Sequence, residues 1–279
     1  MTHAPSAVPL SQASPPDARP VVSFNDISVA FEGPPVLKEI SFSVAPAETR
    51  ILLGPAGVGK SVLLKTIVGL VRPQHGRVEL FGEDITHMPE ENLFPLRART
   101  GFVFQEGALF DSLSVRDNVA YQLIQERVPD DEVDARVIEA LKFVGLEQTF
   151  NLNPSALSGG MRRRVAIARA LIHHPELILY DSPTGGLDPV TSNTIIELIV
   201  KQRDVHATPA LLVTHRLQDA FTLCDHRFDP EQDRMVPLPP GQLNPNTTFL
   251  MLEDGGLIFD GSLDQILHSQ NKFVREFFE

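Results

Sequence analysis

The sequence predicts an α/β fold, in which buried strands alternate with helices. The chain has 279 residues, enough for one sizeable domain or two small lobes. Short, continuously apolar segments at 51–53 and 177–180 are typical of strands that are covered on both faces of a sheet. Apolar residues at helical spacing follow the first of these strands, at 61–70. Strand, loop and helix therefore succeed one another, as in α/β domains.

The charge balance excludes some classes of partner. With 24 basic and 36 acidic side chains, the formal net charge is −12. This excess of acid disfavours nucleic-acid binding, which normally needs a basic face, and electrostatic adhesion to anionic lipid. A single cysteine, Cys224, rules out an internal disulfide and suits a reducing cytoplasm. We interpret Cys224 as a packing residue rather than a catalytic one.

The chain contains no segment that predicts membrane insertion. No apolar run approaches the roughly 20 residues needed to cross a bilayer. Residues 1–20 are rich in Ala, Ser and Pro, with neither a basic start nor an apolar stretch, so we expect a disordered tail rather than a signal peptide. If the protein works at a membrane, a partner must hold it there.

The elements can be assigned in order from the periodicity of apolar residues. Predicted strands lie at 21–31, 40–44, 51–53, 77–81, 100–105, 177–181 and 210–214, with a hairpin at 248–260 that turns at 254–256. Predicted helices lie at 61–70, 160–172 and 191–201, and a helical pattern at 114–144 interrupts the alternation. We expect that last stretch to be an inserted helical lobe.

Two segments stand apart from this alternation. The segment 229–246 holds five prolines and few apolar residues, and we interpret it as a solvated insertion, with a binding element as the alternative. We expect a helical C-terminal tail at 261–279, in which the spacing of Phe273, Phe277 and Phe278 places these rings on one helix face. Packing on the domain is the favoured role for these rings, and partner binding is the alternative.

A glycine-rich loop follows the strand 51–53 and predicts a nucleotide site. Its residues are Gly54, Pro55, Ala56, Gly57, Val58, Gly59, Lys60 and Ser61. The glycines let consecutive backbone N–H groups face a phosphate, and the helix that starts near Lys60 adds its positive end. Lys60 would reach the β and γ oxygens, and the Ser61 hydroxyl would complete a Mg²⁺ shell. The chain has one such loop and no internal repeat, so a second nucleotide site must come from another chain.

Further polar residues follow the other predicted strands. Asp181 ends an apolar strand, where a carboxylate can hold Mg²⁺ through water or simply cap the strand. Gln105 and His215 also stand at strand ends, and each has a purely structural alternative. His173 and His174 lack such a position, and we interpret them as part of a helix terminus.

The run Leu157-Ser158-Gly159-Gly160, between the loop and the Asp181 strand, resembles the signature of ATP-binding cassette (ABC) ATPases. The resemblance spans 21–260 and implies a RecA-like P-loop NTPase core, an antiparallel β subdomain and an inserted α-helical subdomain at about 106–160. It implies that ATP and Mg²⁺ bind. It also implies that Ser158, Gly159 and Gly160 complete the nucleotide site of a second copy, with 186–188 across the dimer seam.

The same resemblance implies roles for three single residues. Gln105 would contact the metal and the attacking water, and His215 would contact the γ-phosphate. Phe31 precedes the P-loop by the distance usual for the aromatic that stacks on adenine, although core packing is an alternative.

Ser182 departs from the family pattern, which has a catalytic glutamate after the strand acid. A serine has no basic pKa near neutrality, and loss of a general base typically costs about 10²–10⁴ in rate. Slow hydrolysis by a homodimer, replacement by another carboxylate, or pairing with a different ATPase subunit would each fit. We favour the first of these, because every other motif is intact.

The segment 104–120 resembles more narrowly the ATPases of Mla/Mce lipid-transport systems, through Gly107-Ala108-Leu109-Phe110 and Asn118-Val119-Ala120. The resemblance implies an integral membrane permease that docks on this segment, a periplasmic Mce-type lipid-binding partner, and a place at the cytoplasmic face of the inner membrane. The alternatives are a soluble ABC ATPase of the cluster-assembly type and a non-hydrolysing, nucleotide-gated regulator.

Overall fold

A six-stranded sheet forms the centre of the computed structural model, which describes residues 19–278. The strands, in spatial order, are β12 (Gly256–Gly261), β11 (Thr247–Glu253), β3 (Thr49–Leu53), β8 (Ala210–Val213), β7 (Leu177–Asp181) and β6 (Thr100–Val103). All are parallel except the edge strand β12, which pairs antiparallel with β11. The expected tail at 1–20 lies outside the described residues except for its last two positions.

The central strands are buried on both faces, as their continuous apolar sequence predicts. Along β3, Ile51 and Leu53 belong to one hydrophobic core, whereas Leu52 belongs to a second core on the opposite face. The same alternation runs through β7, where Ile178 faces the first core and Leu179 the second. The sheet therefore separates two layers of structure.

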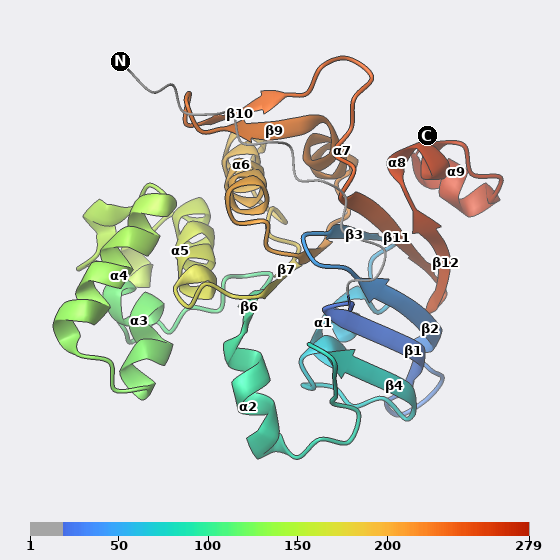
Figure 1. The fold of residues 1–279 in the computed structure, drawn as a ribbon, viewed down its shortest axis with the longest axis horizontal. Coiled ribbons are helices and arrows are strands. Elements are labelled where there is room, and N and C mark those ends of the chain that lie inside the picture. Colours follow the sequence, from blue (N-terminus) through green and yellow to red (C-terminus); the bar gives the residue numbers. More distant parts are fainter. Residues whose placement is uncertain (1–18, 279) are drawn as a thin grey trace, which may run out of the picture.

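A second, antiparallel sheet and the helix α1 (Lys60–Ile67) form the layer over one face. The order in this sheet is β2 (Leu37–Val44), β1 (Val22–Val29), β4 (His75–Leu80) and β5 (Glu83–Asp84). Figure 1 shows α1 between this sheet and the central one. This is the antiparallel β subdomain of the predicted fold class.

Helices form the layer over the other face and extend into a lobe. Figure 1 places α3 (Val115–Gln125), α4 (Asp130–Phe143) and α5 (Gly159–Leu171) together at one side of the molecule. Within α4, Val133, Val137 and Leu141 are fully buried, which explains the helical period read from the sequence. Two short 3₁₀ helices, Glu147–Thr149 and Pro154–Ala156, connect α4 to α5. No helix within residues 19–278 is both long enough and apolar enough to span a bilayer.

The sequence analysis did not assign two helices, α2 (Glu90–Ala98) and α7 (Leu217–Asp225). A further helix, α8 (Leu263–Leu267), lies within the tail that was expected to be helical. α2 contains Pro95 and buries only Leu93 and Leu96, so its apolar period is weak. α6 (Pro189–His206) starts two residues before, and ends five residues after, its predicted limits. The side chain of Asp188 accepts a hydrogen bond from the N–H of Thr191 and so caps α6.

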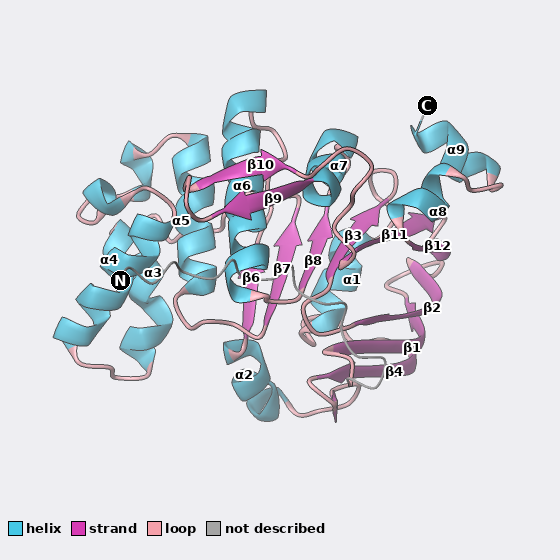
Figure 2. Cartoon of the chain, turned by 45° about the horizontal axis from the view of Figure 1, so that its top comes forward, coloured by secondary structure: helices cyan, strands magenta, loops and turns pink. Residues whose placement is uncertain are grey.

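The proline-rich segment 229–246, interpreted as a solvated insertion, includes a short strand and has no buried residue. β9 (His226–Asp229) and β10 (Arg234–Pro237) pair antiparallel, and Figure 2 shows this hairpin lying over α6. The N–H of Met235 donates to Glu197 of α6 at 2.7 Å, and the N–H of Asn244 donates to the carbonyl of Cys224 at 2.7 Å. These contacts fasten both parts of the segment to the domain.

The C-terminal helix α9 (Lys272–Phe278) packs on the domain through one face. Val274 is fully buried, and the ring of Phe278 lies 6.1 Å from that of Phe221 in α7. Within residues 19–278, this aromatic tail therefore has an intramolecular partner, as the favoured interpretation expected.

A buried amide holds the loop that leads into the helical lobe. Asn118 of α3 is fully buried, and its Oδ1 accepts from the N–H of Phe110 at 2.8 Å. Its Nδ2 donates to the carbonyls of Phe110, Leu113 and Ser114 at 3.0–3.1 Å. One side chain thus satisfies both polar groups of Phe110 and closes residues 110–114 into a turn.

We expect Asn118→Ala to destabilise the protein by about 2–3 kcal/mol, because it leaves buried backbone groups without partners. Chemical denaturation monitored by circular dichroism measures the effect. Gln122→Ala, one turn further along α3, is the control, because Gln122 bonds only to the exposed Glu126. Equal stability of the two variants would contradict this role for Asn118.

Candidate functional site

The carboxyl ends of four parallel strands meet at one edge of the central sheet. Leu52 of β3 lies opposite Val213 of β8, which in turn lies opposite Asp181 of β7. Val103 of β6 lies opposite the residue before Asp181. The glycine-rich loop, Gln105 and His215 all follow these positions by one or two residues. The residues predicted from the sequence therefore lie together at the carboxyl edge of the sheet, where parallel α/β folds bind ligands.

The backbone of the loop 54–61 requires its glycines. Gly54 has φ of 142°, and a Cβ there would lie 2.5 Å from the carbonyl oxygen of Leu252. Gly59 has φ of 105°, and a Cβ there would lie 2.9 Å from a methyl of Leu37. Gly57 has φ of 79° and open space around it. Left-handed glycines followed at once by the start of α1 form a concave row of N–H groups, which fits a bound phosphate.

The ammonium of Lys60 lies over this loop. Its Nζ donates to the carbonyls of Gly54 and Pro55 at 2.7 and 2.6 Å. Partial burial lowers the pKa of Lys60, and the nearby carboxylate of Asp181 opposes that shift. The cation is therefore positioned at the loop by carbonyl groups, and an anion seated in the loop would compensate its desolvation.

Ser61 and Asp181 form a pair of oxygen ligands. The hydroxyl of Ser61 donates to Oδ1 of Asp181 at 3.1 Å, although 120 residues separate them in sequence. Asp181 is only 5 % exposed. A hydroxyl and a buried carboxylate beside a phosphate loop are the donor set that Mg²⁺ prefers, so these residues fit the metal.

The three residues assigned single roles by resemblance are open to solvent. Gln105 and His215 are exposed, at the same edge as Asp181. The ring of Phe31 is 61 % exposed, so core packing does not account for an aromatic at that position.

Ser182 follows Asp181 in a left-handed conformation. Its φ is 49°, its N–H donates to the carbonyl of Val213, and its carbonyl accepts from the N–H of Gly185. Asp219, a carboxylate to which the sequence analysis assigned no role, accepts a short hydrogen bond from Thr184, two residues after Ser182. Burial raises the pKa of Asp219. With a side chain only 3 % exposed, Asp219 cannot take the place of a base that meets water at an open edge.

The Leu-Ser-Gly-Gly run starts α5 on the face of the sheet away from α1. Ser158 caps this helix by accepting from the N–H of Met161 at 3.2 Å. Helix α5 contributes Val165 and Ile167 to the first hydrophobic core, whereas α1 contributes Leu63 and Ile67 to the second. The run and the phosphate loop of the same chain therefore lie in different layers.

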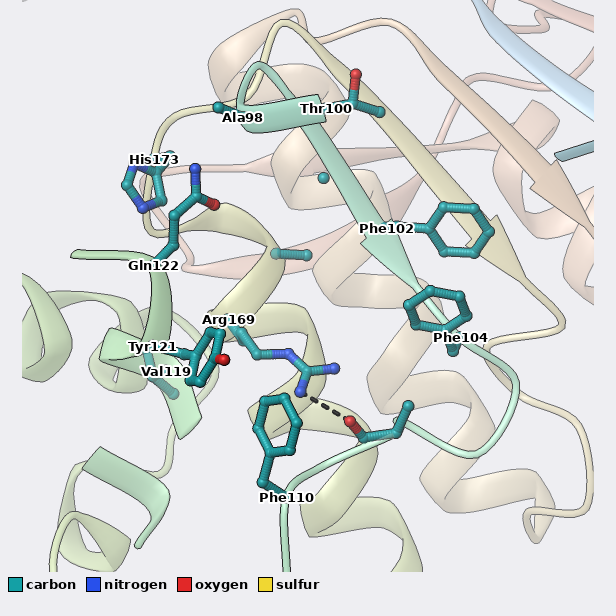
Figure 3. A pocket seen from close by; sticks show the side chains of 13 residues that line it. Ala98, Thr100, Phe102, Phe104, Phe110, Val119, Tyr121, Gln122, Arg169 and His173 are labelled. Carbon is teal, nitrogen blue, oxygen red and sulfur yellow. Dashed lines mark hydrogen bonds between the residues drawn. The ribbon is translucent and has the colours of Figure 1, made fainter. Parts of the chain in front are cut away.

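A cavity of about 430 Å³ opens between β6 and the helical lobe. Figure 3 shows aromatic side chains around it: Phe102 and Phe104 stack at 4.2 Å, and Phe110 and Tyr121 lie 4.8 Å apart. Arg169 of α5 forms part of the wall, and its guanidinium donates to the carbonyls of Gly107 and Ala108 at 2.7 and 2.8 Å. The cavity wall therefore combines four Phe and Tyr rings with small and polar residues, and it lies beside the segment that contains Gln105.

A second arginine of α5 links the same segment to the loop after Asp181. Arg163 is only 7 % exposed, and its guanidinium donates to the carbonyls of Phe104 at 3.3 Å and Gly185 at 3.0 Å. The sequence analysis assigned no role to Arg163. Three consecutive arginines on a helix that must be half buried were the available signal.

Comparison with known proteins places the site in a family. The family model described as "ABC transporter" matches residues 37–185. The intermembrane phospholipid transport system ATP-binding protein MlaF of Escherichia coli (strain K12) is 35% identical over 209 residues, which cover 75% of this chain and 78% of the relative. The methionine import ATP-binding protein MetN 2 of Bacillus cereus is 39% identical over 211 residues, covering 74% of this chain and 62% of the relative.

A solved structure agrees with the fold. A dimeric ATP-binding cassette in a post-hydrolysis state, bound to ADP and Pi, superposes with a TM-score of 0.73 at 28% identity. The superposition covers 87% of this chain and 98% of that one. Members of this family bind ATP with Mg²⁺ and hydrolyse it, and the residues around Lys60, Ser61 and Asp181 fit both ligands. The chain belongs to the ABC transporter family, as an ATP-binding ATPase subunit.

Proposed function

We propose that this chain powers a membrane permease that moves phospholipid or another hydrophobic molecule, and that it works as a homodimer. The observation that carries the dimer is the separation of the two halves of the nucleotide site within one chain. The phosphate loop and the start of α5 belong to different layers, so Ser158, Gly159 and Gly160 would complete the site of a second copy. The solved relative bound to ADP and Pi is itself dimeric.

The proposed roles at each site rest on the side chains present and on the family resemblance. The loop 54–61 holds the phosphates through its N–H groups, and Lys60 neutralises the β and γ oxygens. Bound Mg²⁺ would be held by Ser61 and Asp181, and it would polarise the transferred phosphoryl group. Gln105 would contact the metal and the attacking water, and His215 would contact the γ-phosphate.

Within residues 19–278, neither residue considered as a general base is suited to the role, so we expect hydrolysis to be slow. Ser182 cannot accept a proton near neutral pH. Asp219 is buried, and its Oδ2 accepts from both Thr184 and Thr214. The closed dimer is then long-lived. A nucleotide-gated regulator that releases no phosphate is the second candidate, and the serine at position 182 is the observation that favours it.

The lipid assignment rests on the similarity to MlaF and on the segment 104–120. MetN 2, which is named for methionine import, is 39% identical, so similarity alone does not decide the substrate. The aromatic cavity between β6 and the helical lobe is the dock that we assign to an apolar helix of the permease. The protein would then lie at the cytoplasmic face of the inner membrane, held by the permease, with an Mce-type lipid-binding partner in the complex. Co-purification from detergent-solubilised membranes tests this, and a purely soluble partner would reject it.

We expect Ser182→Glu to raise Mg-ATP turnover of the reconstituted complex about 10²-fold, because it restores a general base. Phosphate release under saturating ATP measures this. Ser182→Ala should match the wild type within about twofold, because the hydroxyl takes no part in proton transfer. Wild-type turnover equal to that of Ser182→Glu would reject slow hydrolysis, and wild-type turnover no higher than that of Lys60→Ala would favour the regulator.

We expect Tyr121→Asp to weaken permease binding about tenfold or more, because it places a carboxylate among the apolar surfaces at the dock. Pull-down of the permease with tagged variants measures the loss. Leu267→Asp is the matched control, since Leu267 is also an exposed apolar residue but lies on α8. Permease binding that survives Tyr121→Asp would place the dock elsewhere.

We expect Phe31→Ala to weaken ATP binding about tenfold and Phe31→Tyr to preserve it, because stacking needs only an aromatic face. Equilibrium titration with ATP measures the affinity. Phe94→Ala is the control, since that ring is equally exposed at 62 % but lies on α2. An unchanged affinity in Phe31→Ala would remove Phe31 from the nucleotide site.

A further inference from the structure

The side chain of Arg216, the residue after His215, reaches the loop that precedes α6. Its Nη1 donates to the carbonyl of Leu187 at 3.3 Å and to the hydroxyl of Ser192 at 2.8 Å. Its backbone N–H donates to the hydroxyl of Thr214 at 3.0 Å, on the other side of His215. One residue therefore joins the loop that carries His215 to the segment 187–192.

A buried carboxylate fixes the direction of this guanidinium. Nε of Arg216 lies 3.5 Å from Oδ1 of Asp219, whose side chain is only 3 % exposed. The other oxygen of Asp219 accepts a short hydrogen bond from Thr184 and a longer one, at 3.4 Å, from Thr214. Because Asp219 is itself held by two threonines, Arg216 is aimed at Leu187 rather than free to sample solvent.

The segment that Arg216 contacts packs against the start of α5. A Cβ at Gly159 would lie 3.7 Å from a methyl of Leu187, and a Cβ at Gly160 would lie 2.3 Å from a methyl of Thr191. The second distance leaves no room for a side chain, so α5 and α6 begin in direct contact. A displacement of Leu187 or Thr191 must therefore be transmitted to the first turn of α5.

We infer that Arg216 is a positioning residue that couples the two nucleotide sites of the dimer. It ties the loop of His215, which senses the γ-phosphate in its own site, to Ser158–Gly160, which complete the site of the partner copy. ATP binding in one nucleotide site would then position Ser158–Gly160 for the nucleotide site of the partner copy. This inference rests on the proposed function, because it requires an ATP-driven dimer.

ATP-dependent dimerisation of the full chain tests the inference. Analytical ultracentrifugation over a range of Mg-ATP concentrations gives the half-point and the steepness, and titration of dilute monomer gives the affinity for ATP. For the wild type we expect a Hill coefficient approaching about 2, the number of sites. For Arg216→Ala we expect an unchanged monomer affinity, a half-point raised about tenfold, and a Hill coefficient near 1.

Four further variants separate positioning from a general structural role. Arg216→Lys keeps the charge and can reach one acceptor, so it should restore part of the steepness. Ser192→Ala and Asp219→Asn alter the contacts around the guanidinium and should each reproduce part of the loss, even if Arg216→Ala itself fails to fold. Arg227→Ala is the matched control, because Arg227 is partly exposed on β9 and pairs only with Asp229 within the described residues.

Two results would overturn the inference alone. In the first, the wild type dimerises with ATP and Arg216→Ala dimerises with the same steepness. In the second, the monomer affinity of Arg216→Ala for ATP falls as much as its dimerisation, which would confine Arg216 to its own site. A wild type that binds ATP without dimerising would instead reject the proposed function, and the inference would fall with it.

Discussion

The hydrogen-bond register of three neighbouring parallel strands is the constraint on which the site depends. It sets Leu52 opposite Val213 and Val213 opposite Asp181. The phosphate loop, the loop that carries His215, and Asp181 itself therefore lie at the same edge of the sheet. The register is itself fixed by packing. Leu52 and Val213 face one hydrophobic core, whereas the residues next to them in each strand face the other core. A register shift of one residue would turn each of these side chains toward the wrong core. The positions of the site residues at this edge therefore depend on the packing of the two hydrophobic cores.

The charges at this edge are consistent with the proposed slow hydrolysis. Lys60 places a cation at the phosphate loop, and Asp181 is engaged with Ser61. A glutamate at position 182 would add a second carboxylate close to the γ-phosphate, where like charges repel. Under the proposed function, a serine there would remove that repulsion together with the general base. Binding would be stronger and hydrolysis slower, and both effects would prolong the proposed closed state.

The sequence predicted the central sheet well because its strands are buried on both faces and carry unbroken apolar runs. It also located Lys60, Ser61 and Asp181, since each belongs to a motif with a defined strand or helix beside it. It missed α2 and α7, whose short apolar patterns fall below what periodicity can resolve. The contacts of Arg163, Arg216 and Asp219 could not be predicted either. They join segments that only the folded sheet brings together, and an arginine that donates to carbonyls leaves no sequence pattern.

The short loop 182–185 explains why these unpredicted charges matter. On one side its Gly185 carbonyl accepts from Arg163, which also donates to the carbonyl of Phe104 beside the proposed permease dock. On the other side its Thr184 hydroxyl donates to Asp219, which lies beside Arg216 at the proposed dimer seam. A four-residue loop fastened at both ends has little freedom of its own. A movement of the helical lobe against the permease and a movement of the partner copy would therefore reach the same backbone, and Ser182, at the start of that loop, would respond to both.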